Sequence, residues 1–241
     1  MREDVRNDAF ETLGRPHSGC IVYTCEHASN RVPAPLRPTP SDRALLRTHW
    51  GYDIGAAWLT RRLAHGDVAV LSRASRLVLD SNRDPTDPTL ALSMTHDGPV
   101  SFNQGLRVSD IEDRIRRFHV PLHDEINRVM TVARPRLLVS IHTFTPIWQG
   151  IAREVEAGIL FDSHDEAAAA MIRVMRTDGW KVKANEPYSG KAGLIYSAAR
   201  HGNAAGVPYF EIEVRQDLVA TRLQAEAVAD RIRSAMRECG W

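Results

Sequence analysis

The sequence contains only three cysteines, Cys20, Cys25 and Cys239, and none belongs to a Cys-x-x-Cys pair. An odd number of widely spaced cysteines argues against a disulfide framework and against a cysteine-based zinc site. Cys25 can be read as a nucleophile or as a buried thiol, and the buried thiol is the simpler interpretation. We therefore expect reduced thiols that have no catalytic role.

The sequence also lacks a charge excess and a long apolar run. Its 31 Lys and Arg residues nearly balance 30 Asp and Glu residues, which gives a net charge of +1. Such a balance argues against nucleic acid or anionic lipid as a partner. No run approaches the roughly 18 apolar residues of a membrane span, and residues 1–16 are charged and lack the apolar core of a signal peptide. We expect a soluble, cytoplasmic protein that acts on a small molecule.

No repeat, low-complexity tract or linker divides the sequence. Its composition, 43% hydrophobic and 25% charged, is that of an ordinary globular protein. Residues 33–40 and 85–99 are rich in turn-forming residues, and we interpret them as loops within one domain that covers residues 1–241.

Short apolar runs alternate with helical patterns along the chain. The predicted strands cover residues 20–24, 68–72, 76–80, 136–142, 158–162 and 208–214. The predicted helices cover residues 42–62, 110–133, 164–177 and 220–238. Because the strands are apolar on both faces, the pattern predicts an α/β fold in which helices cover both sides of a mostly parallel sheet.

Polar residues lie at the ends of several of these apolar runs or directly follow them. They are Glu26, His27, Asn82, Arg83, Asp84, His142, Glu211, Glu213 and Arg215. Ligands of open α/β sheets bind beyond the carboxyl ends of the strands, which makes this set a candidate site. Two histidines and a carboxylate form the ligand set of a catalytic zinc site, in which the fourth position is open to water. Zinc lowers the pKa of that water to about 7.

Glu213 is our candidate for the carboxylate that moves a proton between the attacking water and the leaving nitrogen. The alternative is that Glu213 forms a salt bridge with Arg215 or another basic neighbour.

Asn82 and Arg83 lie on a loop that Pro85 constrains, where the planar guanidinium is suited to bind a carboxylate. The alternative is that Arg83 pairs with Asp80 or Asp84 and braces the loop.

Seven motifs occur together in an order and approximate spacing known from one protein family. They are CEHASNRVP, HWGYDIGA, LVLDSNRDP, FHVPLHDEIN, SIHTFTP, NEPYSG and YFEIEVRQDL. Over about residues 19–217 the sequence resembles the N-formylglutamate amidohydrolase family. The resemblance implies a three-layer α/β/α sandwich around a mixed sheet, similar to the zinc carboxypeptidases. It also implies hydrolysis of N-formyl-L-glutamate to formate and glutamate, and a role in histidine degradation.

The resemblance also implies roles for single residues. His27 and His142 match the two metal-site histidines of the family, Asn82 and Arg83 match the pair that holds the substrate carboxylate, and Glu213 falls at the position of the general base. We expect Zn²⁺, or another divalent metal, as the cofactor.

The third metal ligand is open between three residues. Asp53 matches an acid of the deformylases and is our choice, Glu26 is the second choice, and Asn30 stands where carboxypeptidases carry a glutamate. The chain reads HAS and HWGYD where many deformylases read His-Ser-Gly and Asp-Trp-His-Val-Asp. These differences allow another N-acyl amino acid as the substrate.

Several further residues receive weaker predictions. His119 and His123 lie four residues apart and can form a metal pair on one helix face, unless Pro121 only marks a kink. By resemblance, His123 contacts the substrate or the oxyanion instead. Tyr188 lies on a loop that closes over the substrate or is a plain surface turn. His49, Asp80 and Asp162 are candidates to orient the metal ligands, and Trp50, Trp58 and Trp148 are candidates for core or pocket wall.

Three functions are compatible with the sequence. The first is a metal-dependent amidohydrolase that removes the N-formyl group, or another N-acyl group, from an amino acid. The second is a carboxypeptidase-like hydrolase that uses the same metal on a short peptide or acylated amine. The third is a non-catalytic binding module for an anionic metabolite.

Overall fold

The computed structural model describes residues 7–241, and a mixed sheet of seven strands runs through it. The strand order is β1 (Phe10–Leu13), β3 (Val68–Ser72), β2 (Ile21–Cys25), β6 (Leu137–Phe144), β11 (Tyr209–Arg215), β9 (Ala157–Leu160) and β10 (Val182–Ala184). The four central strands β3, β2, β6 and β11 are parallel, whereas β1 and β9 run antiparallel to their neighbours β3 and β11. The predicted mixed, mostly parallel sheet is therefore confirmed.

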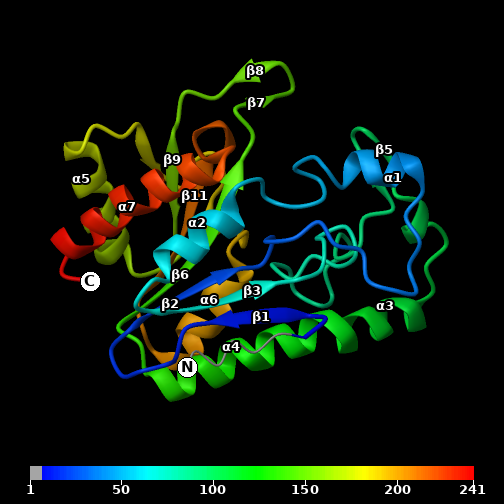
Figure 1. The fold of residues 1–241 in the computed structure, drawn as a ribbon, viewed down its shortest axis with the longest axis horizontal. Coiled ribbons are helices and arrows are strands. Elements are labelled where there is room, and N and C mark those ends of the chain that lie inside the picture. Colours follow the sequence, from blue (N-terminus) through cyan, green and yellow to red (C-terminus); the bar gives the residue numbers. More distant parts are fainter. Residues whose placement is uncertain (1–6) are drawn as a thin grey trace.

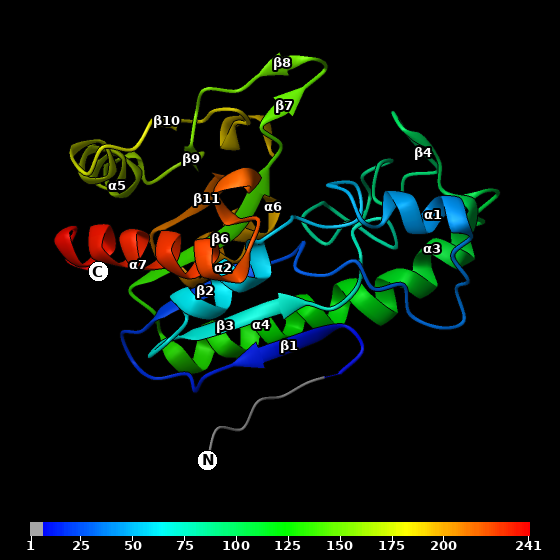
Figure 2. The ribbon, with the colours of Figure 1, turned by 45° about the horizontal axis from the view of Figure 1, so that its top comes forward.

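Helices cover both faces of this sheet, as the two ribbon views show (Figure 1, Figure 2). One core packs under α2 (Ala56–Leu63), α5 (Asp165–Thr177) and α7 (Arg222–Glu238). The other core packs under α4 (Val120–Ala133) and α6 (Tyr196–Ala205). In β2, Tyr23 and Cys25 belong to the first core and Val22 to the second, because successive side chains of a strand point to opposite faces. The predicted three-layer α/β/α sandwich is confirmed.

Cys25 lies entirely within the first core. Burial raises the pKa of its thiol to about 12, so the thiol is protonated at neutral pH. This environment agrees with the buried-thiol interpretation.

The carboxyl ends of the four central strands meet at one edge of the sheet, and the longest connections gather there. The connection after β2 contains α1 (Pro40–Leu45), and the connection after β3 contains the small hairpin β4 (Met94–Thr95) and β5 (Gly98–Pro99), a 3₁₀ turn over Ser101–Asn103 and α3 (Val108–Arg114). After β6, the hairpin β7 (Ile147–Trp148) and β8 (Ile151–Ala152) projects from the body of the molecule (Figure 1). This edge is where a ligand of an open sheet is expected.

Two predicted elements differ from the structure. Residues 76–80 form turns instead of a strand, because the Val78 amide bonds the Ser75 carbonyl and the Asp80 amide bonds the Leu90 carbonyl. The predicted helix over residues 42–62 is split into α1 and α2. The chain leaves helical geometry between them, and Gly55 takes a φ of +87°, which other residues avoid.

The predicted helix over residues 110–133 is present as one helical stretch with an irregular turn. A π-helical turn over Ile115–His119 joins α3 to α4 directly before Pro121, which has no amide hydrogen to donate. The helices predicted over residues 164–177 and 220–238 correspond to α5 and α7. Within residues 7–241, no helix combines the length and apolarity needed to cross a bilayer.

Candidate metal centre and active site

Two histidines and an aspartate meet at the carboxyl edge of the sheet. His27 follows β2, Asp53 precedes α2 and His142 lies in β6, and one ligand atom from each lies within 4.8 Å of the others. Asp53 Oδ2 is 2.8 Å from His142 Nδ1 and 3.4 Å from His27 Nδ1. All three side chains are buried. The structure thus brings together the three residues that we predicted as metal ligands.

The outer nitrogen of each histidine is bound to a carboxylate. His27 Nε2 donates to Asp80 Oδ1 at 2.6 Å, and His142 Nε2 donates to Glu26 Oε2 at 3.1 Å. Arg76 in turn donates to the second oxygen of Asp80 at 3.0 Å. Carboxylates that hold the outer nitrogens of histidines fix the ring orientation in metal sites. His27 Nδ1 is buried and makes no hydrogen bond to the described residues, and only Asp53 Oδ2, at 3.4 Å, approaches it, as two ligands of one ion would.

The three candidates for the third ligand occupy different places. Glu26 lies against Nε2 of His142, whereas Asp53 lies against Nδ1 of the same ring. Asn30 lines a separate, shallower depression of the surface. The geometry therefore favours Asp53 as the ligand and gives Glu26 an orienting position, as Asp80 has for His27.

The cluster carries more buried negative charge than its own residues balance. Burial raises the pKa of Glu211 to about 8 and that of Glu213 to about 7, and neighbouring carboxylates reinforce both shifts. The carboxylates Glu211, Asp53 and Glu26 hold the pKa of His142 well above its usual range, in spite of burial. Each shift means that the site retains protons to reduce its negative charge. A divalent cation among these two nitrogens and one carboxylate neutralises the same charge, and the donor set suits zinc.

A cavity of about 320 Å³ opens over the cluster. The residues that we chose as metal ligands, proton carrier and substrate-binding groups line it, whereas His123 does not. The lining residues of this set are His27, Asp53, Asn82, Arg83, His142, Tyr188 and Glu213. His49, Trp50 and Trp148 also form part of the wall, whereas Trp58 is exposed on α2. Asp162 accepts a hydrogen bond from Tyr209 and lies outside the lining.

Asn82 and Arg83 have partners within the protein. Asn82 Oδ1 accepts from the Ser197 amide at 3.0 Å, so the amide side chain ties the loop to the start of α6. Arg83 lies 3.4 Å from Asp80 and 3.3 Å from Asp87, and its side chain is 30% exposed. These long ion pairs brace the loop and leave part of the guanidinium facing the cavity.

His119 and His123 do not face the cavity. His123 Nε2 donates to the Ser81 carbonyl at 3.0 Å, and His119 Nε2 donates to the Arg83 carbonyl at 3.1 Å. His123 Nδ1 lies 2.7 Å from His201 Nε2. Burial lowers the pKa of all three rings, which keeps them neutral. The two helix histidines therefore hold the backbone on both sides of Asn82, and the arrangement is not that of a metal pair.

The sequence analysis missed Arg76, His201 and Arg153 as neighbours of the site. Arg76 belongs to the run that we misread as a strand, and His201 lies on α6, which we did not predict. The one feature of the sequence that could have indicated Arg76 is its positive charge at the start of the apolar run over residues 76–80.

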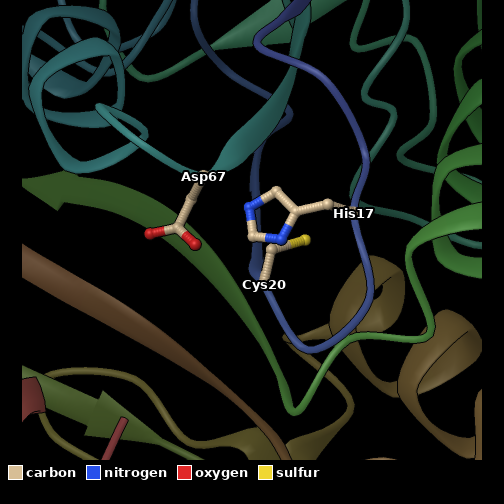
Figure 3. Close-up of side chains that lie close together, drawn as sticks. All are labelled: His17, Cys20 and Asp67. Atoms are coloured by element: carbon tan, nitrogen blue, oxygen red, sulfur yellow. The ribbon is translucent and has the colours of Figure 1, made fainter.

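Two further groups of possible metal ligands occur among the described residues. One, His142, Glu211 and Glu213, shares His142 with the candidate centre, and the other lies at the opposite edge of the sheet (Figure 3). Cys20 directly precedes β2, Asp67 directly precedes β3, and His17 lies on the turn before Cys20. The backbone already binds two of the three, because Asp67 Oδ1 accepts from the Ile21 amide at 2.9 Å and His17 Nε2 donates to the Gly66 carbonyl at 3.2 Å. Burial raises the pKa of the Cys20 thiol, which disfavours the thiolate that a metal requires.

The fold and the buried cluster together define an α/β protein that can bind a metal at the carboxyl edge of its sheet. Residues 19–220 match the family described as N-formylglutamate amidohydrolase, and the chain belongs to this family. Family membership and the His/Asp/Glu cluster together indicate an amidohydrolase. No curated protein matches the sequence significantly.

Two solved structures are similar over nearly the whole chain. A gene product from Agrobacterium tumefaciens is 28% identical, with a TM-score of 0.87, and the match covers 98% of this chain and 97% of that one. An N-formylglutamate amidohydrolase from Ralstonia eutropha JMP134 is 17% identical, with a TM-score of 0.70, and the match covers 95% of this chain and 99% of that one. At this low identity the second likeness is evidence for the fold alone.

Proposed function

We propose that this protein is a metal-dependent amidohydrolase that removes the N-formyl group, or another small N-acyl group, from an amino acid. With N-formyl-L-glutamate the products are formate and glutamate. The observation that carries the proposal is the placement of His27, Asp53 and His142 beside Glu213 in one cavity. The name of the family supports the choice of reaction.

His27, Asp53 and His142 are the residues that we expect to hold a zinc ion. Bound there, zinc polarises a carbonyl and lowers the pKa of a water to about 7. The buried Nδ1 of His27, which makes no hydrogen bond to the described residues, and the acidic excess of the cluster support this assignment.

Glu213 is our candidate for the proton carrier. It lies on β11 in register with His142 on β6, so the parallel ladder fixes its distance from the cluster. Its Oε2 is buried and has no hydrogen-bond partner, and burial raises its pKa to about 7. A carboxyl group with this pKa accepts the proton of the attacking water and returns it to the amide nitrogen as the C–N bond breaks.

The alternative ion pair of Glu213 with Arg215 is not formed among the described residues. Arg215 instead donates to Asp217 at 2.8 Å and to the Arg153 carbonyl at 2.9 Å. Glu213 therefore keeps an oxygen available for the reaction.

Arg83 is our candidate for the group that binds the amino-acid carboxylate, because it lines the cavity and keeps part of its guanidinium exposed. Asn82 and His123 position the same loop, Asn82 through α6 and His123 through the Ser81 carbonyl. Tyr188 forms the facing wall. His123 thus acts through the loop and has no free nitrogen for an oxyanion.

The decisive experiment measures metal and product on the same sample. Purified protein is loaded with zinc, elemental analysis counts the metal, and formate release is followed with N-formyl-L-glutamate. N-acetyl and larger acyl derivatives define the acyl group. One zinc per chain with formate release supports the proposal. Zinc-loaded protein that cleaves none of these amides contradicts it and favours a binding module.

A further inference from the structure

Arg153 lies behind the wall of the cavity and is not itself one of the lining residues. It directly follows β8, at the base of the projecting hairpin. Its guanidinium carbon lies 5.5 Å from the ring centre of Phe144, 5.7 Å from that of Trp148 and 5.3 Å from that of Tyr188. All three rings line the cavity, so the cation lies directly behind the surface that a substrate contacts.

Among the described residues, no carboxylate lies within ion-pair distance of Arg153. Its polar partners are the Thr145 carbonyl and hydroxyl, both at 3.3 Å, and the Tyr188 hydroxyl at 3.4 Å. All of these acceptors are neutral and the distances are long. By contrast, Arg76 lies 3.0 Å from Asp80 and Arg83 lies 3.3 Å from Asp87.

The edge of the Arg153 guanidinium is bound only by long hydrogen bonds to the neutral Tyr188 and Thr145, which a carboxylate can replace. Cation–π contacts stabilise the charge but do not use the donors that bind a carboxylate in the plane of the group. Thr145 and Tyr188, which accept these bonds, are both wall residues, so the donors of Arg153 are close to the cavity. The charge of Arg153 also counteracts the rise in the pKa of Glu213, which places the two groups within electrostatic reach.

We propose that Arg153 is a specificity-determining residue that binds a second anionic group of the substrate, the carboxylate on an acidic side chain. Arg83 binds the α-carboxylate of the same molecule. The inference rests on the proposed function and adds a residue that no sequence motif indicated. A site built to pair a cation discriminates strongly against a neutral analogue, because the analogue leaves that cation unpaired.

The test compares two substrates that differ only at the side chain. N-formyl-L-glutamine has an amide where N-formyl-L-glutamate has a carboxylate, and the two have nearly the same shape. In the wild type we expect a higher kcat/KM for the glutamate derivative. In Arg153→Gln we expect the ratio of the two kcat/KM values to fall about 10- to 100-fold, through a loss confined to the glutamate derivative.

The ratio separates substrate recognition from a structural role. Loss of Arg153 also changes the surroundings of Tyr188 and Glu213, but those changes affect both substrates alike and cancel in the ratio. Arg153→Lys retains the charge, and we expect it to restore part of the preference. Thermal melting of each variant reports whether it is folded.

Arg200→Gln is the matched control. The Arg200 guanidinium also lies over a cavity-lining ring, 5.8 Å from the centre of Tyr196, and donates to the Tyr196 hydroxyl at 2.6 Å. It lies on α6 and does not belong to the hairpin. We expect the substrate ratio of this variant to equal that of the wild type.

Two results overturn the inference: a wild type that does not distinguish the two substrates, or an Arg153→Gln variant that keeps the preference while losing rate on both. If zinc-loaded wild type cleaves neither substrate, the proposed function fails separately. Calorimetric binding of the same two compounds then decides the inference. Tighter binding of the glutamate derivative that is lost in Arg153→Gln supports it, and equal binding of both refutes it.

Discussion

The two edges of the central sheet both gather side chains of the types that can bind metals, but in different environments. At the carboxyl edge, His27, Asp53 and His142 are buried beneath a cavity, and His27 Nδ1 makes no hydrogen bond to the described residues. At the amino edge, His17 is exposed, and backbone groups already bind His17 and Asp67. At both edges, therefore, side chains that can donate electrons to a metal lie close together. Unsatisfied buried atoms and unbalanced charge distinguish the candidate site.

The largest expected effect is on turnover. A substitution at the carboxyl edge of the sheet should lower it, and a substitution at the amino edge should not. Glu213→Gln removes the proton carrier, and we expect kcat to fall about 100- to 1000-fold while zinc remains bound. Formate release and elemental analysis on the same sample check both parts. Asp67→Asn at the amino edge keeps an oxygen for the Ile21 amide and is expected to retain full activity. Full activity in Glu213→Gln removes Glu213 from the mechanism.

Metal affinity provides the next comparison. Asp80→Asn weakens the hydrogen bond that orients His27, and we expect zinc affinity to fall about 10- to 100-fold. Competition with a chelator of known affinity measures the change. His17→Ala is the control and is expected to bind zinc as the wild type does. Loss of zinc in His17→Ala with retention in Asp80→Asn reverses the assignment of the two edges.

A smaller effect is expected for the substrate clamp. Arg83→Lys keeps a positive charge but loses the planar fork, and we expect KM to rise about 10-fold with little change in melting temperature. Steady-state kinetics and thermal melting measure the two quantities. An unchanged KM with a lowered melting temperature makes Arg83 only a brace for Asp80 and Asp87.

The smallest effect concerns stability without metal. Glu211, Glu213 and His142 all have raised pKa values, so these groups bind more protons in the folded protein than in the unfolded chain, and their contribution to stability falls as pH rises. His119, His123 and His201 have lowered pKa values and act in the opposite direction, but only below about pH 6.5, where an unfolded histidine is protonated. The stabilisation by the groups with raised pKa values is complete below the unfolded carboxyl values and is lost as pH rises through about 7 to 8. We expect the melting temperature of zinc-free protein to fall by about 2–4 °C between about pH 6.5 and about pH 8.5, where only the groups with raised pKa values titrate.

Differential scanning calorimetry with and without zinc measures this dependence. Bound zinc neutralises the site, and Glu211→Gln removes one of the titrating groups, so each is expected to flatten the curve. A zinc-free wild type whose stability is constant over this range contradicts the view that the acidic excess is unbalanced.

The sequence predicted the parts of the site that lie at strand ends. His27, His142 and Glu213 follow from apolar runs that the structure confirms as β2, β6 and β11, because a strand buried on both faces produces a clear pattern. Asp53 was assigned by family resemblance, and the structure places it beside both histidines.

Other parts of the fold and of the site could not be predicted from the local pattern of apolar and polar residues. Residues 76–80 are as apolar as a strand because they are buried, but their amides bond within the loop. The environment of Arg153 depends on three rings from β6, the hairpin and the loop at Tyr188. Which contacts such a loop residue makes is decided by tertiary packing, and sequence periodicity carries no information about it.

The residues proposed for catalysis and the residue proposed for selectivity lie on parts of the fold that differ in stability. Glu213 and His142 lie on adjacent central strands, whereas Arg153 follows a hairpin whose two strands pair only with each other. Ile147 and Ile151 of that hairpin are 58% and 73% exposed, so little burial holds it against the body. Peripheral segments of this kind open locally at a lower free energy than central strands. Mild denaturant is therefore expected to make the enzyme promiscuous before it makes it inactive.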